Sequence, residues 1–173
     1  MILHNFTFIL SKEREIQIYI NHPSQFIKQN QQNLLPTWTV SIKSTIIVLQ
    51  KSNFSLENSN HEIEKEKDYL RERFFRLGCN LVFTLRDAQY QSDLFDPRNG
   101  YPLLSRPGNI TLNDTALVQD SLGFNVVKQR CSLLIHPQWG TAIYPSTIVT
   151  SASSEIIQPM LQNLQNFLIE VRR

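Results

Sequence analysis

The segment IEKEKDYLRERFFRLGCNLVFTLRDA, residues 63–88, carries the longest regular pattern of the 173-residue chain. Its apolar side chains recur at intervals of three, four or seven residues, which is the spacing of one buried face of an α-helix. The residues of this face are Ile63, Leu70, Phe74, Leu77, Leu81, Leu85 and Ala88. One interior glycine, Gly78, costs about 1 kcal/mol relative to alanine, which is too little to interrupt the helix. The pattern predicts a continuous helix from Ile63 to Ala88 that contributes most to the core. The small Gly78 beside Cys79 indicates that a neighbouring element approaches closely there.

Upstream of this helix the sequence predicts strands and one short helix. Phe6–Leu10 and Glu15–Ile20 are typical of short strands, and in the second the isoleucines alternate with other residues. Gln25–Leu35 has the pattern of a short amphipathic helix that Pro36 ends. The segment Thr37–Gln50 is rich in β-branched residues and predicts one long strand.

Downstream of the long helix, a loop and a short helix precede two further strands. Asp93–Gly108 is dense in proline and glycine and predicts a loop. Thr115–Leu122 is expected to form a short helix that Gly123 closes in the left-handed conformation. Val126–His136 and Thr141–Thr150 predict two strands.

A final amphipathic helix is expected to start at Ser153 or Ser154. The predicted order is therefore two strands, a helix, a strand, the long helix, a loop, a helix, two strands and a helix. A chain of this length usually forms one domain, so residues 1–173 are expected to fold as a single unit. Strands that follow one another with helices between them predict the α+β class, with a mostly antiparallel sheet covered by helices and the long helix at the centre.

Composition and charge argue against several classes of protein. Seventeen basic and fifteen acidic residues give a formal charge of +2 and are scattered, so no basic stripe is present and we expect no nucleic-acid partner. No apolar run approaches the ~18 residues of a membrane span. The N-terminal residues Met1–His4 lack the features of a signal peptide, and two cysteines are too few for a disulfide framework. These features predict a cytoplasmic protein.

The two cysteines, Cys79 and Cys131, are the candidate reactive groups. Cys131 lies in a predicted strand and shares a face with Leu133 and Ile135, whereas His136 faces the other way. Cys131 and His136 are therefore not expected to form a thiolate–imidazole pair, and no cysteine or histidine pair has the spacing of a zinc site. From the residues alone Cys131 is either a small apolar core residue or an accessible thiol, and Cys79 is interpreted as a packed core residue.

Several other polar or aromatic residues fit structural roles first. Asp93 and Asp96 suggest paired carboxylates, but they lack the ligand spacing of a calcium loop and a partner base. Asp96–Gly100 is a good turn sequence, in which the aspartate caps the backbone and the glycine adopts positive φ. Trp139 is either a core residue or a partner contact, and His136 is interpreted as a hydrogen-bonded structural residue. The sequence contains no nucleophile elbow, phosphate-binding loop or dinucleotide fingerprint.

The order of these motifs resembles that of the cblD-type cobalamin trafficking family, also called methylmalonic aciduria and homocystinuria type D proteins. The motifs are the long helix followed by Asp93–Gly100, then Leu122–Phe124, a cysteine in a strand, and His136–Thr141. The likeness is clearest over Glu62–Leu161 and weaker over Glu15–Gln50.

This resemblance implies a nitroreductase-like core without flavin and a role that is not enzymatic. Members of the family engage a cblC-type cobalamin-processing protein, and a family cysteine on this strand becomes a thiolate ligand of the cobalt. By resemblance Cys131 takes this role, and a thiolate is a soft ligand suited to such a metal. The animal proteins have two adjacent cysteines here. Counted forward from Leu122–Phe124, Cys131 matches the first of them, the ligand; counted backward from Trp139–Thr141, it matches the second.

The leading hypothesis is a cobalamin-handling adapter that binds no cofactor stably alone and meets cobalamin only in complex with its partner. Cys131 approaches the cobalt, no other metal is expected, and other residues contact the partner. The residues assigned to this contact are Asp93, Asp96, Trp139, Gly140 and Thr141. The alternative is a scaffold or assembly factor of the same fold with no cobalamin role. A flavin-binding reductase ranks last, because the sequence shows no basic cluster that would hold the flavin phosphate.

Overall fold

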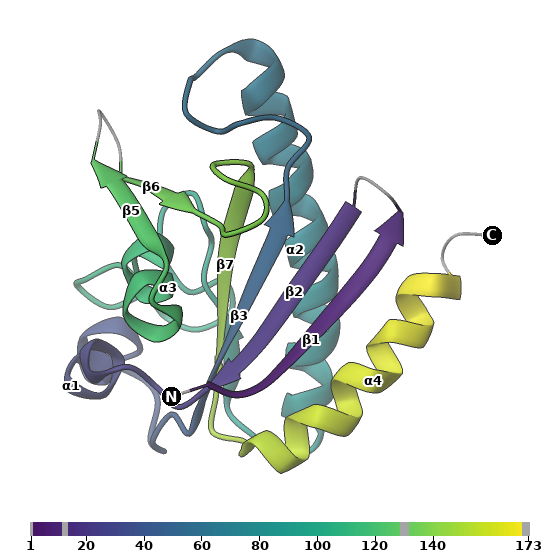
Figure 1. Ribbon diagram of the computed structural model, residues 1–173. Coiled ribbons are helices and arrows are strands. Elements are labelled where there is room, and N and C mark those ends of the chain that lie inside the picture. The colour runs from purple at the N-terminus through teal and green to yellow at the C-terminus, as the bar shows by residue number, and fades with distance from the viewer. Residues whose placement is uncertain (1, 12–13, 129–131, 171–173) are drawn as a thin grey trace.

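The computed structural model describes residues 2–11, 14–128 and 132–170 (Figure 1). A five-stranded sheet has the order β1-β2-β3-β7-β4 with every neighbouring pair antiparallel, and β5 pairs with β6 in a separate two-stranded sheet. The strands are β1 (Ile2–Ser11), β2 (Arg14–Asn21), β3 (Ser44–Lys51), β4 (Ser92–Leu94), β5 (Asn125–Lys128), β6 (Ser132–Ile135) and β7 (Ile143–Thr150). The helices are α1 (Gln25–Leu34), α2 (His61–Asp87), α3 (Asp114–Leu122) and α4 (Ser154–Glu170). The predicted α+β class, with a mostly antiparallel sheet and one long helix, is confirmed.

Helices cover both faces of the five-stranded sheet (Figure 1). α2 and α4 lie on one face, whereas α1, α3 and the β5–β6 pair lie on the other. Each face has its own buried cluster, because successive residues of a strand point to opposite sides. In β3, Ile46 and Val48 belong to the first cluster, while Ile47 and Leu49 belong to the second. β3 is thus buried on both faces, which explains why its apolar residues run consecutively.

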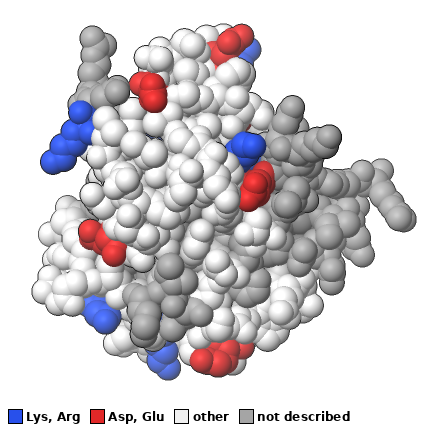
Figure 2. Space-filling model, viewed as in Figure 1, with Lys and Arg blue, Asp and Glu red and all other residues white. Residues whose placement is uncertain are grey.

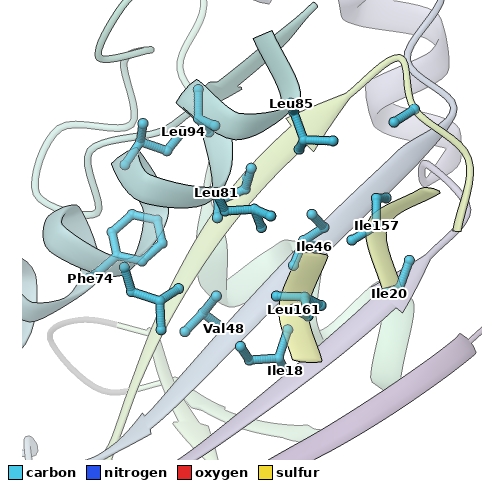
Figure 3. Close-up of a cluster of buried hydrophobic side chains, with 14 of the residues drawn as sticks. Ile18, Ile20, Ile46, Val48, Phe74, Leu81, Leu85, Leu94, Ile157 and Leu161 are labelled. Carbon is cyan, nitrogen blue, oxygen red and sulfur yellow. The ribbon is translucent and has the colours of Figure 1, made fainter. Parts of the chain in front are cut away.

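The first cluster fills the space between the sheet and the helices α2 and α4 (Figure 3). Its sheet residues are Ile16, Ile18, Ile20, Ile46, Val48, Leu94 and Ile148. From α2, Phe74, Leu81 and Leu85 project into this space, and Ile157 and Leu161 come from α4. None of these five helix side chains is exposed to solvent. The predicted alternation of β2 is confirmed, and so is the predicted buried face of α2 except at Ala88, which follows the helix and is exposed.

The long helix begins and ends close to the residues that the pattern predicts. Asn60 caps its first turn, because the side-chain oxygen of Asn60 accepts from the backbone N–H of Ile63 at 2.9 Å. Gly78 packs against β4, and a Cβ atom at this position would lie only 2.9 Å from Cδ1 of Leu94. The predicted close approach at Gly78 is confirmed, and a larger residue there would force the Leu94 side chain to move.

The predicted strand Thr37–Gln50 is wrong for residues 37–43. β3 begins only at Ser44, and the segment before it is irregular. A side chain from another element takes a backbone hydrogen bond there: the side-chain oxygen of Gln31 accepts from the N–H of Ile42 at 2.9 Å. Because such bonds replace those of a neighbouring strand, β-branched composition alone does not show where the strand starts.

The predicted single strand Val126–His136 is also wrong. The chain folds back on itself, so that β5 and β6 pair antiparallel, with Asn125 opposite Ile135 and Lys128 opposite Ser132. Residues between these two strands, 129–131, lie outside the described part of the chain. An alternating pattern looks the same whether the chain continues or reverses, so periodicity does not reveal the reversal.

The predicted loop Asp93–Gly108 contains a strand at its start. Residues 92–94 form β4, and Leu94 pairs with Ile148 of β7. Three residues are too few to show the two-residue period of a strand. The prolines and glycines that follow predict a loop for the whole segment.

Capping residues define the ends of α1 and α3. Ser24 caps α1 by accepting from the N–H of Ile27 at 3.3 Å, and Asn113 caps α3 with a bond of 3.0 Å to a backbone N–H three residues on. Gly123 ends α3 with φ 72°, the left-handed conformation that favours glycine. α4 starts at Ser154. The predictions for these helices are confirmed.

Candidate functional site

Trp139, Gly140 and Thr141, three of the predicted site residues, lie in the turn between β6 and β7, and Thr141 lines a cleft beside it. A cleft of about 590 Å³ opens between β6, the start of β7 and the connector before α2. Leu133, Thr141, Tyr144 and Lys67 are among the residues that line it. The cleft therefore combines apolar and hydrogen-bonding surface beside β6, the strand that directly follows Cys131.

Cys131 itself lies outside the described residues, but its surroundings are described in part. Lys128 and Ser132, which pair with each other at the end of the β5–β6 ladder, are both exposed. Leu133 and Ile135, the residues expected to share a face with Cys131, are half-buried, whereas the residue between them is buried. The face of β6 assigned to Cys131 is thus the less deeply buried one.

The turn after β6 is built around His136. The backbone N–H and C=O of His136 both pair with Gly140, at 2.8 and 3.0 Å. The imidazole stacks on Trp139 with ring centroids 3.8 Å apart, and Phe124 packs edge-on at 5.3 Å. Trp139 is only 9% exposed and belongs to the second cluster, whereas Gly140 is exposed and Thr141 is half-buried. The surface of this turn is therefore formed by the exposed Pro137, Gln138 and Gly140 with the half-buried Thr141, and Trp139 supports it from inside.

Hydrogen bonds hold the His136 ring on two sides. Nδ1 lies 3.1 and 3.2 Å from the backbone nitrogens of Gln138 and Trp139, and Nε2 lies 3.0 Å from the side-chain oxygen of Gln17 in β2. The residue is 3% exposed, and burial lowers the pKa of His136 below its ordinary value. The interpretation of His136 as a hydrogen-bonded structural residue is confirmed.

Asp96 organises the turn that its sequence predicts. Its carboxylate accepts two hydrogen bonds from Arg71 of α2, at 2.7 and 2.6 Å, and one from the backbone N–H of Arg98 at 3.0 Å. The Arg71 guanidinium therefore holds the pKa of Asp96 below its usual range. Gly100 has φ 72°, and a Cβ atom there would lie 2.4 Å from the carbonyl oxygen of Leu112, so only glycine fits. The predicted turn, with positive φ at its glycine, is confirmed.

Asp93 is fully buried and serves the loop that follows it. Its carboxylate accepts from the backbone N–H groups of Leu104 at 3.0 Å and Ser105 at 2.6 Å, and a guanidinium nitrogen of Arg86 lies 3.8 Å away. Asp93 and Asp96 each have their own arginine and their own backbone donors. The two carboxylates are therefore occupied separately and do not form an acid–base pair.

Other residues form the surface near these two aspartates. Tyr101 and Leu103 follow the Asp96 turn and are 42% and 40% exposed. Asp93 and Asp96 hold the shape of the loop, while Tyr101 and Leu103 present apolar side chains to solvent. Sequence patterns did not single out these two residues, because a tyrosine before proline in a loop indicates only a turn.

The carboxyl of Asp114, at the start of α3, meets a partner that the sequence does not indicate. Asp114 accepts a hydrogen bond from the hydroxyl of Thr147 in β7, and burial, with a contribution from Asp96, raises the pKa of Asp114 to about 7. Tyr144 of the cleft wall is affected by the same acid, since burial and Asp114 both raise the pKa of Tyr144. Because Thr147 is 33 residues away in the chain, no local spacing could indicate the contact.

The described cysteine, Cys79, lies at the edge of the core, and the three other histidines are at the surface. Cys79 is half-buried and packs against the first cluster, and burial raises the pKa of its thiol. His4, His22 and His61 are exposed. Within the described ranges, no three histidine, cysteine, aspartate or glutamate residues are grouped so that they could hold a metal ion.

Charge is sparse on the visible surface. On the face shown in Figure 2, blue and red side chains are scattered over a largely uncharged surface and form no continuous strip. Among the described helices, none is both long enough and apolar enough to cross a membrane.

Comparison with known proteins identifies the family. The family model described as "Methylmalonic aciduria and homocystinuria type D protein" matches residues 8–165, most of the chain. The chain belongs to this family. The match contains the Asp93–Gly108 loop, the position of Cys131 and the His136 turn. It also extends upstream of Glu62–Leu161, the region in which the motifs are clearest.

Three curated relatives of this family member share the name "Cobalamin trafficking protein CblD". The rat protein (Rattus norvegicus) is 27% identical over 132 residues, 76% of this chain and 45% of the relative. The mouse protein (Mus musculus) is 26% identical over 142 residues, 82% of this chain and 48% of the relative. The human protein (Homo sapiens) is 26% identical over 132 residues, 76% of this chain and 45% of the relative. The chain thus spans about half the length of the curated relatives that it matches.

Proposed function

We propose that this family member is a non-enzymatic adapter that handles cobalamin together with a cblC-type cobalamin-processing protein. The observation that carries the proposal is the family match over residues 8–165, and the relatives' name as cobalamin trafficking proteins supports it. Asp93, Asp96 and His136 use their polar atoms in structural hydrogen bonds. This arrangement favours a binding surface over a catalytic centre.

In this proposal Cys131 approaches the cobalt as a thiolate. Cys131 directly precedes β6, the residues Lys128 and Ser132 beside it are exposed, and β5 and β6 form a sheet of their own apart from the five strands. The thiol releases its proton to solvent and a sulfur lone pair fills a coordination position on the metal, with no change in oxidation state. A soft thiolate suits this role. The cobalamin stays in the partner, so this chain binds no cofactor stably by itself.

The proposed partner surface consists of the Asp93–Gly108 loop and the turn after β6. Asp93, Asp96 and Trp139 shape this surface from within, and Gly140 and Thr141 lie at it. A cytoplasmic location and a nitroreductase-like core without flavin belong to the same proposal.

Absorption spectroscopy tests the proposed cobalt ligand. Cob(II)alamin bound to a cblC-type protein is titrated with this chain, and a change in the visible spectrum is expected for the wild type and for Cys79→Ser. Cys131→Ser should give no change, because the serine oxygen is a hard ligand that ionises poorly. Equal spectral changes from both serine variants would remove Cys131 from the proposal.

Alkylation of the native protein provides a second test that needs no partner. Cys131 should react faster than Cys79, because reactivity follows exposure and thiolate fraction, and Cys79 is half-buried with a raised pKa. If both thiols react equally slowly and Cys131→Ser only lowers stability, Cys131 is a core residue. A scaffold or assembly role without cobalamin would then replace the adapter role.

A further inference from the structure

The polar contact between the β5–β6 pair and the main sheet has no role in the function proposed above. We call β5, β6 and residues 136–140 the hairpin unit. Gln17 of β2 is the centre of the contact: its side-chain oxygen accepts from the His136 ring and from the hydroxyl of Tyr19, at 3.0 and 2.8 Å. The Gln17 amide nitrogen donates to Glu15 at 3.1 Å. Gln17 is 8% exposed and His136 is 3% exposed, so the contact is shielded from water.

These hydrogen bonds define the protonation state of the ring. Nδ1 of His136 faces the backbone N–H groups of Gln138 and Trp139, so it accepts and carries no proton. The single ring proton is therefore on Nε2 and is donated to Gln17. The bond from Gln17 to Glu15 keeps the Gln17 oxygen turned toward the ring. An imidazolium does not fit this arrangement, because its Nδ1 proton would point at two other donors.

We propose that His136 is the positioning residue of the hairpin unit: as a neutral imidazole it ties the unit to β2, and protonation of the ring loosens this tie. The inference depends on the proposed function only where it concerns Cys131, which is expected to reach the cobalt from the hairpin unit. Acidification would then change how firmly the thiolate is presented to the partner.

Burial and one carboxylate act on the ring in opposite directions. Phe124 and Trp139 cover the ring and carry no charge. β2 contributes Tyr19, which stays protonated because burial raises its pKa, and Glu15, whose carboxylate favours the imidazolium. Burial outweighs Glu15 and lowers the pKa of His136 below 6.5.

This lowered pKa sets the direction of the pH dependence. In the loosened state the ring is hydrated and takes up a proton more readily than in the docked state. The docking free energy is therefore fully present above the ordinary imidazole pKa of about 6.5 and decreases as the pH falls below it.

Fluorescence and NMR of the wild-type protein test the proposal directly. Trp139 reports on the ring that it stacks on, because a protonated imidazole quenches indole emission. Emission should fall on acidification below about pH 6.5, the ordinary imidazole pKa. It should not fall in Trp139→Phe, which retains Trp38.

Over the same pH range, amide exchange of Gln138 and Trp139, corrected for its intrinsic pH dependence, should rise about tenfold, because each of the two N–H groups loses its hydrogen bond to the ring. A His136 ring that titrates at the ordinary imidazole pKa of about 6.5, with unchanged amide exchange, would overturn the proposal.

Two glutamine variants separate positioning from general stability. His136→Gln is neutral at every pH and should lose the pH dependence of Trp139 emission, whereas His22→Gln, at an exposed histidine, should keep it. If His136→Gln does not fold, the NMR titration of the wild type still decides. If Trp139 emission falls on acidification but cobalamin shows no spectral change at any pH, the positioning role of His136 is supported and the role of Cys131 is overturned. If the cobalamin spectrum changes but Trp139 emission does not fall on acidification, the role of Cys131 is supported and the positioning role is overturned.

Discussion

The core between the sheet and α2 and the connecting segments around it are held by different kinds of contact. In the core, regular elements bury apolar faces, as Phe74 and Leu81 do against the alternating residues of β2 and β3. The connecting segments are held by single polar side chains. The Gln31 side chain is hydrogen-bonded to the segment before β3, the Asp93 carboxylate to the loop after β4, and the His136 ring of the hairpin unit to Gln17 of β2.

The difference lies in how each region responds to one substitution. Removing an apolar side chain from the core leaves a cavity, whose cost depends on the lost volume. Removing a buried acceptor leaves its donors without partners, and each unpaired donor carries its own desolvation cost. The first effect lowers global stability, whereas the second first loosens the segment that the side chain holds.

The largest effect is expected in the core. Phe74→Ala should lower the free energy of unfolding by roughly 3–5 kcal/mol, because the ring is fully buried between α2 and the sheet. Phe83 is the matched control on the same helix: it is 50% exposed, and Phe83→Ala should cost at most about 0.5 kcal/mol. Denaturant titration measures both values. A loss below half a kcal/mol for Phe74→Ala, of the order of a surface change, would remove α2 from the core.

The second-largest effect is expected from removing the carboxylate of Asp93, which holds the loop after β4. Asp93→Ala should cost about 2–4 kcal/mol, since the N–H groups of Leu104 and Ser105 and the Arg86 guanidinium lose a buried acceptor. Hydrogen exchange should rise first in the loop that follows β4 and only later in α2. Asp120→Ala, at an exposed aspartate, is the control that should leave both measurements unchanged. Equal acceleration in the loop and in α2 would show that the two regions unfold together.

A pH-dependent effect is expected at the start of α3. The pKa of Asp114 is raised to about 7, so its protonated form is favoured in the folded state, and stability falls as the pH rises from about 4 through 7. Asp114→Asn keeps the acceptor for Thr147 but cannot ionise. It should be more stable than the wild type by roughly 2–4 kcal/mol at pH 8, with no advantage at pH 4. Thermal unfolding at both pH values measures the difference, and a constant difference would contradict the raised pKa.

The smallest effect is expected where α2 passes into its connecting segment. Gln89 follows the helix with φ 69°, a left-handed conformation that costs a side-chain-bearing residue more than glycine. Gln89→Gly should therefore raise the free energy of unfolding by about 0.5–1 kcal/mol. Gln119→Gly, inside α3, should lower it by about the same amount, because glycine weakens a helix interior. Two changes of the same sign would contradict the conformational argument.

Local patterns in the sequence determined the regular core. The 3- and 4-residue spacing predicted α2 within two residues at its start, the alternation of isoleucines predicted the buried face of β2, and Gly78 and Gly123 marked a close approach and a helix end. The order of the loop and turn motifs also led to the family that the comparison shows. These features can be predicted because each depends on a pattern of residues that are close in the sequence.

Tertiary structure alone decided where the chain reverses between β5 and β6 and which polar side chains are buried. The sequence places Asp93 and Asp96 in a loop and leaves Trp139 open between a core residue and a partner contact, yet the structure buries all three. Asp114 meets a hydroxyl 33 residues away, and His136 meets Gln17 at a separation of 119 residues. A buried polar group needs a specific partner, and that partner can come from any part of the chain. Spacing shows which residues share a face, but only the folded chain brings such a donor and acceptor together.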